Sequence, residues 1–145
     1  MTMHIWKIVV LFLIFIGCAV MGCSQETLKT SPENLLGRWQ MVKAIQSGNE
    51  VDKPNPYLRR YEVEIEFLPD GKLTGTSSAN PMVGQYETQS SNFISIHCGY
   101  ESKVGENAWG DLFADTIENV DTYKIKNNML FLSHMDNQLI FQKIK

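Results

Sequence analysis

Apolar and polar residues alternate along much of the chain, and this period of two predicts a β-rich fold. The clearest stretch is 61–67, where Tyr, Val, Ile and Phe occupy one face and three Glu the other. Pro69-Asp70-Gly71 follows, and because proline presets φ while glycine allows a positive φ, a tight turn is expected there. Strands are predicted in this way over 36–45, 61–67, 72–77, 83–88, 92–97, 122–126, 129–134 and 139–143.

The period changes once, over 106–120, where the side chains that face one way recur every three or four positions and predict a helix. These positions are Trp109, Leu112, Phe113, Thr116, Ile117 and Val120. Residues 47–60 are polar, contain two prolines, and predict a loop. Most connections are of hairpin length, which favours antiparallel pairing. The expected fold class is therefore mainly β (α+β), a curved, barrel-like antiparallel sheet of about eight strands packed with one helix.

Residues 1–22 differ from the rest and predict a bacterial secretory signal peptide. Lys7 is the only charged residue of this segment, and nine apolar residues, 8–16, follow it. Nine residues fall far short of the roughly 20 that a bilayer-spanning helix needs. An uncleaved anchor and a plain soluble secretion signal are the alternatives.

The tetrad Val20-Met21-Gly22-Cys23 resembles a lipobox, with an aliphatic residue three positions and a small residue one position before the cysteine. It predicts cleavage between Gly22 and Cys23 and lipidation of the Cys23 thiol. Acylation by more than one chain suffices for stable membrane anchoring, whereas a single short chain does not.

Gly17-Cys18 is a rival cleavage site, but its preceding residues match the lipobox poorly. Ser24 follows the lipidation position and favours the outer membrane of the cell envelope. Residues 23–33 are polar and aperiodic and predict a flexible tether. The folded domain is expected over 34–145.

Net charge and cysteine content exclude some classes of function. The 145 residues carry a net charge of −3, and removal of 1–22 leaves 12 Lys+Arg against 16 Asp+Glu, a balance of −4. This acidic balance argues against a nucleic-acid partner. Three cysteines cannot build a disulfide scaffold, and only Cys98 belongs to the expected domain.

Five short motifs follow one another in a distinctive order. They are Leu35-Leu36-Gly37-Arg38-Trp39, Phe67-Leu68-Pro69-Asp70-Gly71-Lys72, the Gly75–Tyr86 stretch, Leu112-Phe113-Ala114-Asp115-Thr116-Ile117, and the Tyr123–Leu132 stretch. In order and spacing they resemble the META domain family, the HslJ-like bacterial envelope lipoproteins, over roughly residues 35–144. The resemblance implies a domain packed solid inside and a role in heat-stress or antibiotic tolerance rather than catalysis.

The chain departs from the family pattern at two positions. Many members have a cysteine where this chain has Ala79, and a second cysteine before the helix, which aligns here with Glu106. Their joint absence fits the loss of a paired feature. Cys98 is then the single thiol of the domain.

Candidate chemistry is sparse. His97-Cys98 suggests a nucleophile, but adjacent strand residues point to opposite faces, so the base would have to be the distant His134. The cysteines and histidines do not have the spacing of a zinc site. Asp111 and Asp115 share a helix face and are expected to be solvated. Cys98, Trp39 and Trp109 are expected to be structural, and no catalytic, cofactor-binding or metal-binding residue is predicted.

Three functions remain open. The first is a non-catalytic envelope lipoprotein, held at the membrane by its N-terminal lipid and partnered by an unknown envelope protein or small ligand. The second is a lipocalin-like carrier of a small apolar ligand, which would need a cavity inside the sheet. The third, an enzyme built on Cys98 or on the carboxylates, ranks well behind.

Overall fold

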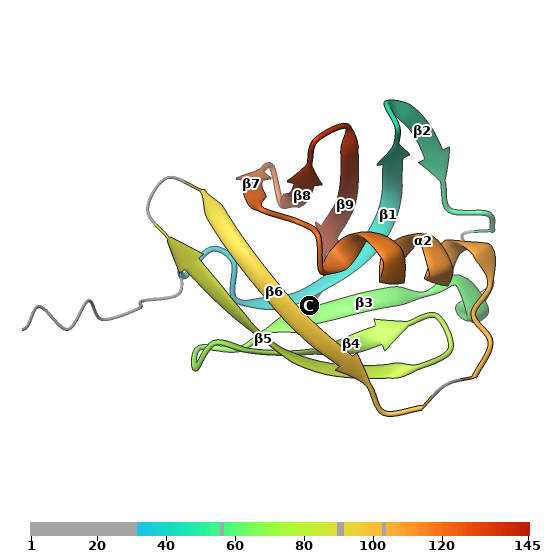
Figure 1. Cartoon of the computed structure of the whole chain (residues 1–145), viewed down its shortest axis with the longest axis horizontal. Coiled ribbons are helices and arrows are strands. Elements are labelled where there is room, and N and C mark those ends of the chain that lie inside the picture. The colour runs from blue at the N-terminus through green and yellow to red at the C-terminus, as the bar shows by residue number, and fades with distance from the viewer. Residues whose placement is uncertain (1–31, 56, 90–91, 103) are drawn as a thin grey trace, which may run out of the picture.

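The structure is a computed structural model that describes residues 32–55, 57–89, 92–102 and 104–145. Nine antiparallel strands and one α-helix make up the domain (Figure 1). They are β1 (Gly37–Gln46), β2 (Asn49–Asp52), β3 (Val63–Phe67), β4 (Lys72–Ser77), β5 (Pro81–Gln89), β6 (Phe93–Tyr100), α2 (Ala108–Ile117), β7 (Thr122–Lys126), β8 (Met129–His134) and β9 (Asn137–Lys143), with a 3-10 turn, η1 (Arg59–Tyr61). The predicted fold class, mainly β with one helix, is confirmed.

The sheet curves round until its first and last strands meet. Neighbours pair in the order β2-β1-β3-β4-β5-β6-β7-β8-β9, and β1 also pairs with β9. The β1–β9 register runs from Trp39 opposite Lys143 to Ile45 opposite Gln138, with a bulge after Met41. Eight strands therefore form a closed ring of hydrogen bonds, and β2 lies outside it as a short edge strand.

Turn residues fix the register of the hairpins. Asn127 and Asn128 both have positive φ values, 53° and 60°, as the predicted two-residue turn between β7 and β8 requires. Gly71 has a φ of 77° in the predicted turn between β3 and β4, where the Leu68 N–H donates to the Lys72 carbonyl.

Helix α2 begins where Asn107 caps it. The Asn107 side chain accepts hydrogen bonds from the N–H groups of Trp109 and Gly110. The helix packs against β9 and β4, two strands on different sides of the ring, and lies between the upper and lower strands in Figure 1. Its buried face follows the predicted stripe, with Trp109, Leu112, Phe113 and Ile117 all inside.

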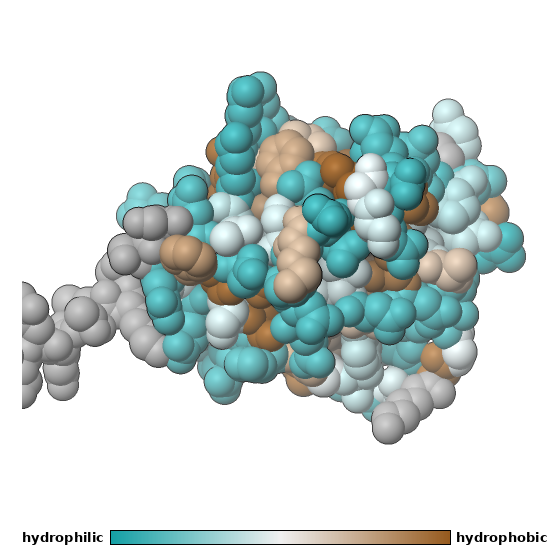
Figure 2. All heavy atoms as spheres, turned by 45° about the horizontal axis from the view of Figure 1, so that its top comes forward, coloured by the Kyte–Doolittle hydropathy of each residue, from teal (hydrophilic) through white to brown (hydrophobic). Residues whose placement is uncertain are grey.

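The interior is filled by large side chains from nearly every strand and the helix. The largest that are fully buried are Trp39, Trp109, Phe67, Phe113, Phe141, Leu35 and Met41. Phe67 stacks edge-on against Tyr86, and Phe113 lies edge-on to Phe141. The face seen in Figure 2 is mostly hydrophilic, and its hydrophobic residues form small separate patches. The predicted core positions of Trp39 and Trp109 are confirmed.

Two details differ from the expectation. Strand β2 lies within the predicted loop 47–60, and α2 covers 108–117 rather than 106–120. Residues 1–31, which include the expected signal peptide, Gly22 and Cys23, lie outside the described residues. The described chain starts with a turn in which the Leu35 N–H donates to the Pro32 carbonyl, and Leu35 is already part of the core.

Candidate functional site

A polar cluster joins the β4–β5 hairpin to the segment before α2, and Glu106 is at its centre. The Glu106 carboxylate accepts hydrogen bonds from the hydroxyls of Ser77 and Ser78, from the side-chain amide of Asn80, and from the Ala79 N–H at 3.1 Å. Ser77 and Asn80 are buried, the only polar residues of the described part that are. Four donors match the roughly four lone-pair sites of a carboxylate.

Asn80 extends the cluster towards the chain that precedes the helix. Its side-chain oxygen accepts from the Val104 N–H at 2.8 Å and from the Ser102 hydroxyl at 2.7 Å. Its amide donates to the Val104 carbonyl at 2.8 Å. Side-chain hydrogen bonds therefore hold the β4–β5 hairpin against the segment that precedes α2.

The charge of Glu106 is stabilised by these donors. Partial burial by itself raises the pKa of the carboxyl, but the hydrogen bonds from Ser77, Ser78, Asn80 and the Ala79 N–H outweigh it and lower the pKa. The cluster brings Ala79 and Glu106 into contact, and these are the two positions that the family resemblance aligns with cysteines of other members. A hydrogen-bonded carboxylate stands where that pair would lie.

The remaining chemical candidates do not come together. Cys98 is half-buried, and burial, together with the negative charge of Glu118, raises the pKa of its thiol to about 11. His97 on the same strand is exposed. His134 instead contacts Asp121, with Nδ1 at 2.9 Å from the carboxylate. A nucleophilic thiol with a histidine base is therefore not assembled by these three residues.

The acidic helix face is solvated, as expected. Asp111 and Asp115 are both exposed. Within the described ranges, His, Cys, Asp and Glu form no group able to hold a metal ion. Trp109 is packed inside the domain, and its indole N–H has no hydrogen-bond partner among the described residues.

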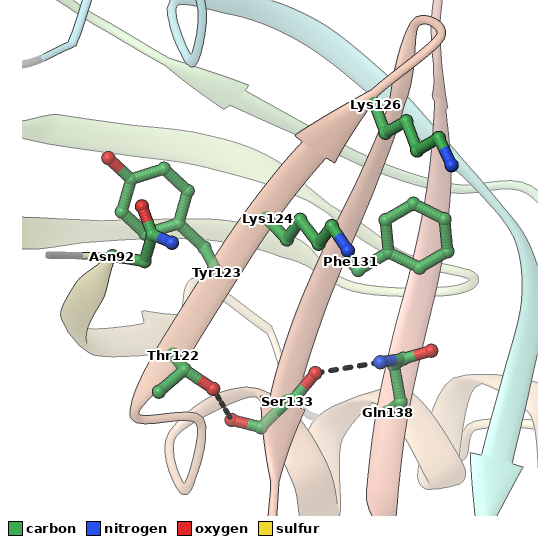
Figure 3. A pocket seen from close by; sticks show the side chains of 8 residues that line it. All are labelled: Asn92, Thr122, Tyr123, Lys124, Lys126, Phe131, Ser133 and Gln138. Carbon is green, nitrogen blue, oxygen red and sulfur yellow. Dashed lines mark hydrogen bonds between the residues drawn. The ribbon is translucent and has the colours of Figure 1, made fainter.

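A pocket of about 630 Å³ lies on β7, β8 and β9. It is lined by Asn92, Thr122, Tyr123, Lys124, Lys126, Phe131, Ser133 and Gln138. Figure 3 shows both lysine side chains extending from β7 on the same side of the sheet as Phe131. In the register of the two strands, Lys124 lies directly opposite Phe131.

Polar groups form the end of this pocket nearest the β8–β9 turn. The Gln138 amide donates to the Ser133 hydroxyl at 2.8 Å, and the Thr122 hydroxyl donates to the Ser133 carbonyl at 3.3 Å (Figure 3). Lys124 and Lys126 form no ion pair with a carboxylate of the described residues, unlike Arg38, Lys43 and Lys72. The pocket therefore offers two free ammonium groups beside an aromatic ring.

A family model for the META domain matches residues 33–145, nearly the whole described chain. The chain belongs to the META domain family. Its resemblance to that family, seen first in the five motifs, is thereby confirmed. A search of curated protein sequences finds no match.

Two solved structures share the fold of this META domain. A DUF4847 family protein from Bacteroides vulgatus matches with a TM-score of 0.58 and 16% identity, over 76% of this chain and 94% of that chain. A protein from Burkholderia xenovorans, solved by NMR, matches with a TM-score of 0.59 and 14% identity, over 74% and 82%. The matched part is nearly all of the Bacteroides chain.

The META domain also contains a site that the sequence reasoning missed. Thr122, Lys124 and Lys126 occupy every second position of a predicted strand and therefore lie on one face. This spacing already placed the two lysines side by side. The position of Phe131 opposite Lys124 depends on strand register, which the sequence did not supply. Among the described residues, no helix is long and apolar enough to cross a bilayer.

Proposed function

We propose that this META protein is a bacterial envelope lipoprotein, anchored through lipid on Cys23, whose domain acts without catalysis in envelope maintenance or stress tolerance. The observation that carries the proposal is the tetrad Val20–Cys23, which follows the nine-residue apolar run 8–16 after a spacer of three residues. Ser24 favours the outer membrane as the location. A filled domain interior and the raised pKa of Cys98 agree with a non-catalytic role.

Metabolic labelling with a palmitate analogue tests the anchor. Cys23→Ser is expected to abolish labelling and signal-peptide cleavage, whereas Cys18→Ser, the matched control, leaves both intact. Mass spectrometry of the mature N-terminus should then find an acylated cysteine at position 23. A free amine at another residue, or labelling that depends on Cys18, overturns the proposal.

The role in the envelope has its own test. A deletion strain is expected to be more sensitive to heat and to envelope-active antibiotics, and a plasmid copy with Cys98→Ala should restore tolerance as well as the native gene. Tolerance equal to that of the parent strain under these stresses contradicts the envelope role. Failure of the Cys98→Ala copy alone would support an enzyme.

A lipocalin-like carrier is the competing function. Such a carrier needs an apolar cavity inside its sheet, whereas the centre of this sheet is occupied by Trp39, Trp109, Phe113 and Phe141. We expect no saturable, one-to-one binding of a fluorescent fatty acid by the domain. Binding at micromolar affinity that quenches the buried tryptophans would favour the carrier.

A further inference from the structure

We propose that the outer face of β7–β9 binds the headgroups of anionic lipids and holds the domain against the membrane. The basic face, as we name it, consists of Lys124, Lys126, Phe131, Thr122, Ser133 and Gln138. The inference deepens the proposed function, because it rests on the lipid anchor that brings the domain to a bilayer.

Charge is the first argument. Residues 122–145 contain four lysines and a single acidic residue, Asp136, whereas residues 1–121 carry nine basic and fifteen acidic residues. The strands β7–β9 are therefore a basic region in an acidic protein. Asp121, the acidic residue next to β7, is turned towards His134. Asp136 lies in the β8–β9 turn, at the opposite end of the hairpins from Lys126.

The shape of the face is the second argument. Lys124 and Lys126 are exposed, and Phe131 is half-buried between them and β9. Ile140 lies opposite Phe131 and is only 8% exposed, although it is not part of the main core cluster. Phe131 and Ile140 thus form a small apolar surface next to the two lysines. Lysine stems suit the boundary between headgroups and acyl chains, and an apolar phenylalanine ring beside them suits the acyl side of that boundary.

The third argument is where the chain enters the domain. Lys143 donates through its ammonium group to the carbonyls of Asn34 at 3.3 Å and Leu36 at 2.9 Å. Its backbone N–H donates to the Asn128 carbonyl at 2.9 Å. The first described residues therefore lie beside the β7–β8 turn, directly after Lys126. Few residues separate Cys23 from this point, and roughly ten extended residues reach only about 35 Å.

The tether explains why two lysines are enough. Each lysine near an anionic surface contributes on the order of 1 kcal/mol, about a fivefold change in partition. That is too weak to recruit a freely diffusing protein. A short tether raises the effective concentration of the face at the bilayer to roughly the millimolar range, so that weak contacts become populated.

Amine footprinting of the lipidated protein tests the proposal. The protein is reconstituted into phosphatidylcholine vesicles with or without phosphatidylglycerol and treated briefly with an acetylating reagent, and each lysine is followed by mass spectrometry. Lys124 and Lys126 are expected to react several-fold more slowly only when phosphatidylglycerol is present, and 0.5 M salt should remove the protection. Lys53, on the loop after β2, is the internal control and should react equally in all samples.

Three outcomes overturn the proposal: unprotected Lys124 and Lys126, equal protection of Lys53, or protection by soluble glycerol phosphate in neutral vesicles. The last result would assign the pocket to a soluble anion. The acylated Cys23 peptide is measured in the same digest, so that a failed anchor is distinguished from a failed basic face.

A variant pair gives an independent measure. In the lipidated protein on phosphatidylglycerol vesicles, Lys124→Gln/Lys126→Gln is expected to lower the ratio of membrane-bound to free domain about 25-fold, measured as lost protection of Phe131 from hydroxyl-radical oxidation. Lys53→Gln/Arg59→Gln removes the same charge elsewhere and should lower it much less. Equal losses in the two variants would show that net charge alone governs binding, and would contradict a specific face.

Discussion

The carboxylate of Glu106 links parts of the chain that are almost thirty residues apart. Each of its oxygens accepts two hydrogen bonds, one pair from Ser77 and Asn80 and the other from Ser78 and the Ala79 N–H. Removing an acceptor of this kind leaves buried donors without partners, which is costly. Because the bonds depend on the negative charge, this link is sensitive to pH, whereas a disulfide at the same place would be sensitive to redox conditions.

The first prediction concerns this pH dependence. The pKa of Glu106 is lowered in the folded state, so its contribution to stability is complete above the ordinary glutamate pKa of about 4.3 and is lost as the pH falls through the lowered folded value. Urea unfolding between pH 7 and pH 3 should show a smaller loss of stability in Glu106→Gln than in the unaltered protein. Asp115→Asn, the corresponding change at an exposed helix position, is the matched control for the removal of one carboxylate. Parallel profiles for Glu106→Gln and the unaltered protein would disprove the linkage.

The second prediction reverses a rule of helix stability. Glycine inside a helix is usually worse than alanine by about 1 kcal/mol, so Gly110→Ala would ordinarily stabilise the protein. Here a Cβ at Gly110 would clash with the side chains of Glu106 and Ser78 and lie 2.8 Å from the Ser77 carbonyl. We expect Gly110→Ala to lower the free energy of unfolding by about 1–3 kcal/mol, measured in urea. A gain in stability would show that the cluster can move aside.

The third prediction concerns Cys98. Burial and Glu118 raise the pKa of its thiol to about 11, so only about one molecule in a thousand holds a thiolate at pH 8. Peptide mapping should find alkylation of Cys98 by iodoacetamide to be at least tenfold slower in the folded protein than in 6 M urea. Equal rates would mean that the thiol is activated, and would revive the enzyme hypothesis.

At the scale of elements, alternation predicts strands where each has one buried face. Strand β3 shows this best, with Val63, Ile65 and Phe67 inside and glutamates between them. Strand β2 was missed for the opposite reason. It pairs only with β1, holds a single apolar residue, Val51, and is largely exposed, so nothing imposes a period on it. The positive φ values of Ser47 and Gly48 show that a tight turn precedes it.

Contacts between distant segments could not be predicted in the same way. The Glu106 cluster joins residues that only the family resemblance suggested as partners. The pocket on β7–β9 depends on which strand face points outward and on the register that sets Phe131 opposite Lys124. A single sequence supplies neither of these, whereas local periodicity supplies the strands themselves.

The fourth prediction concerns the strand pair of the ring with the fewest paired residues, β6 and β7. Strands β6 and β7 share one register pair, Phe93 with Thr122, and nearby backbone bonds from Ile94 to Asp121 and from Tyr123 to Asn92. Strands β1 and β9 share six pairs. Hydrogen exchange should therefore release the Ile94 and Tyr123 amides well before those of β1 and β9. Equal protection at both joints would show that the ring opens only on global unfolding.

At the scale of the whole molecule, Trp39 occupies the meeting point of the sheet. It lies on β1 opposite both Ile65 of β3 and Lys143 of β9. Its indole N–H donates to the Leu35 carbonyl at 2.7 Å, and the Lys143 ammonium lies 4.9 Å from its ring. Trp39 therefore connects the segment that precedes β1 with strands β3 and β9.

The fifth prediction follows from that position. Trp39→Ala should lower the free energy of unfolding by about 3–5 kcal/mol, which is a large part of the 5–15 kcal/mol typical of a domain. Circular dichroism in urea measures the loss. Tyr57→Ala removes an aromatic side chain that is 92% exposed and should change stability by less than about 0.5 kcal/mol. A similar effect of both substitutions would contradict the central place of Trp39.

The pairing of β1 with β9 has a consequence for how the chain is made. Strand β1 finds one of its two principal partners only in Asn137–Lys143, the last strand of the described residues. The ring thus cannot close while β9 is still inside a ribosome or a translocation channel. On the lipoprotein route proposed above, the chain would stay threadable until β9 is free, so that the signal peptide could be removed and Cys23 lipidated before the ring closes. For an exported chain, folding is thereby timed by its own topology.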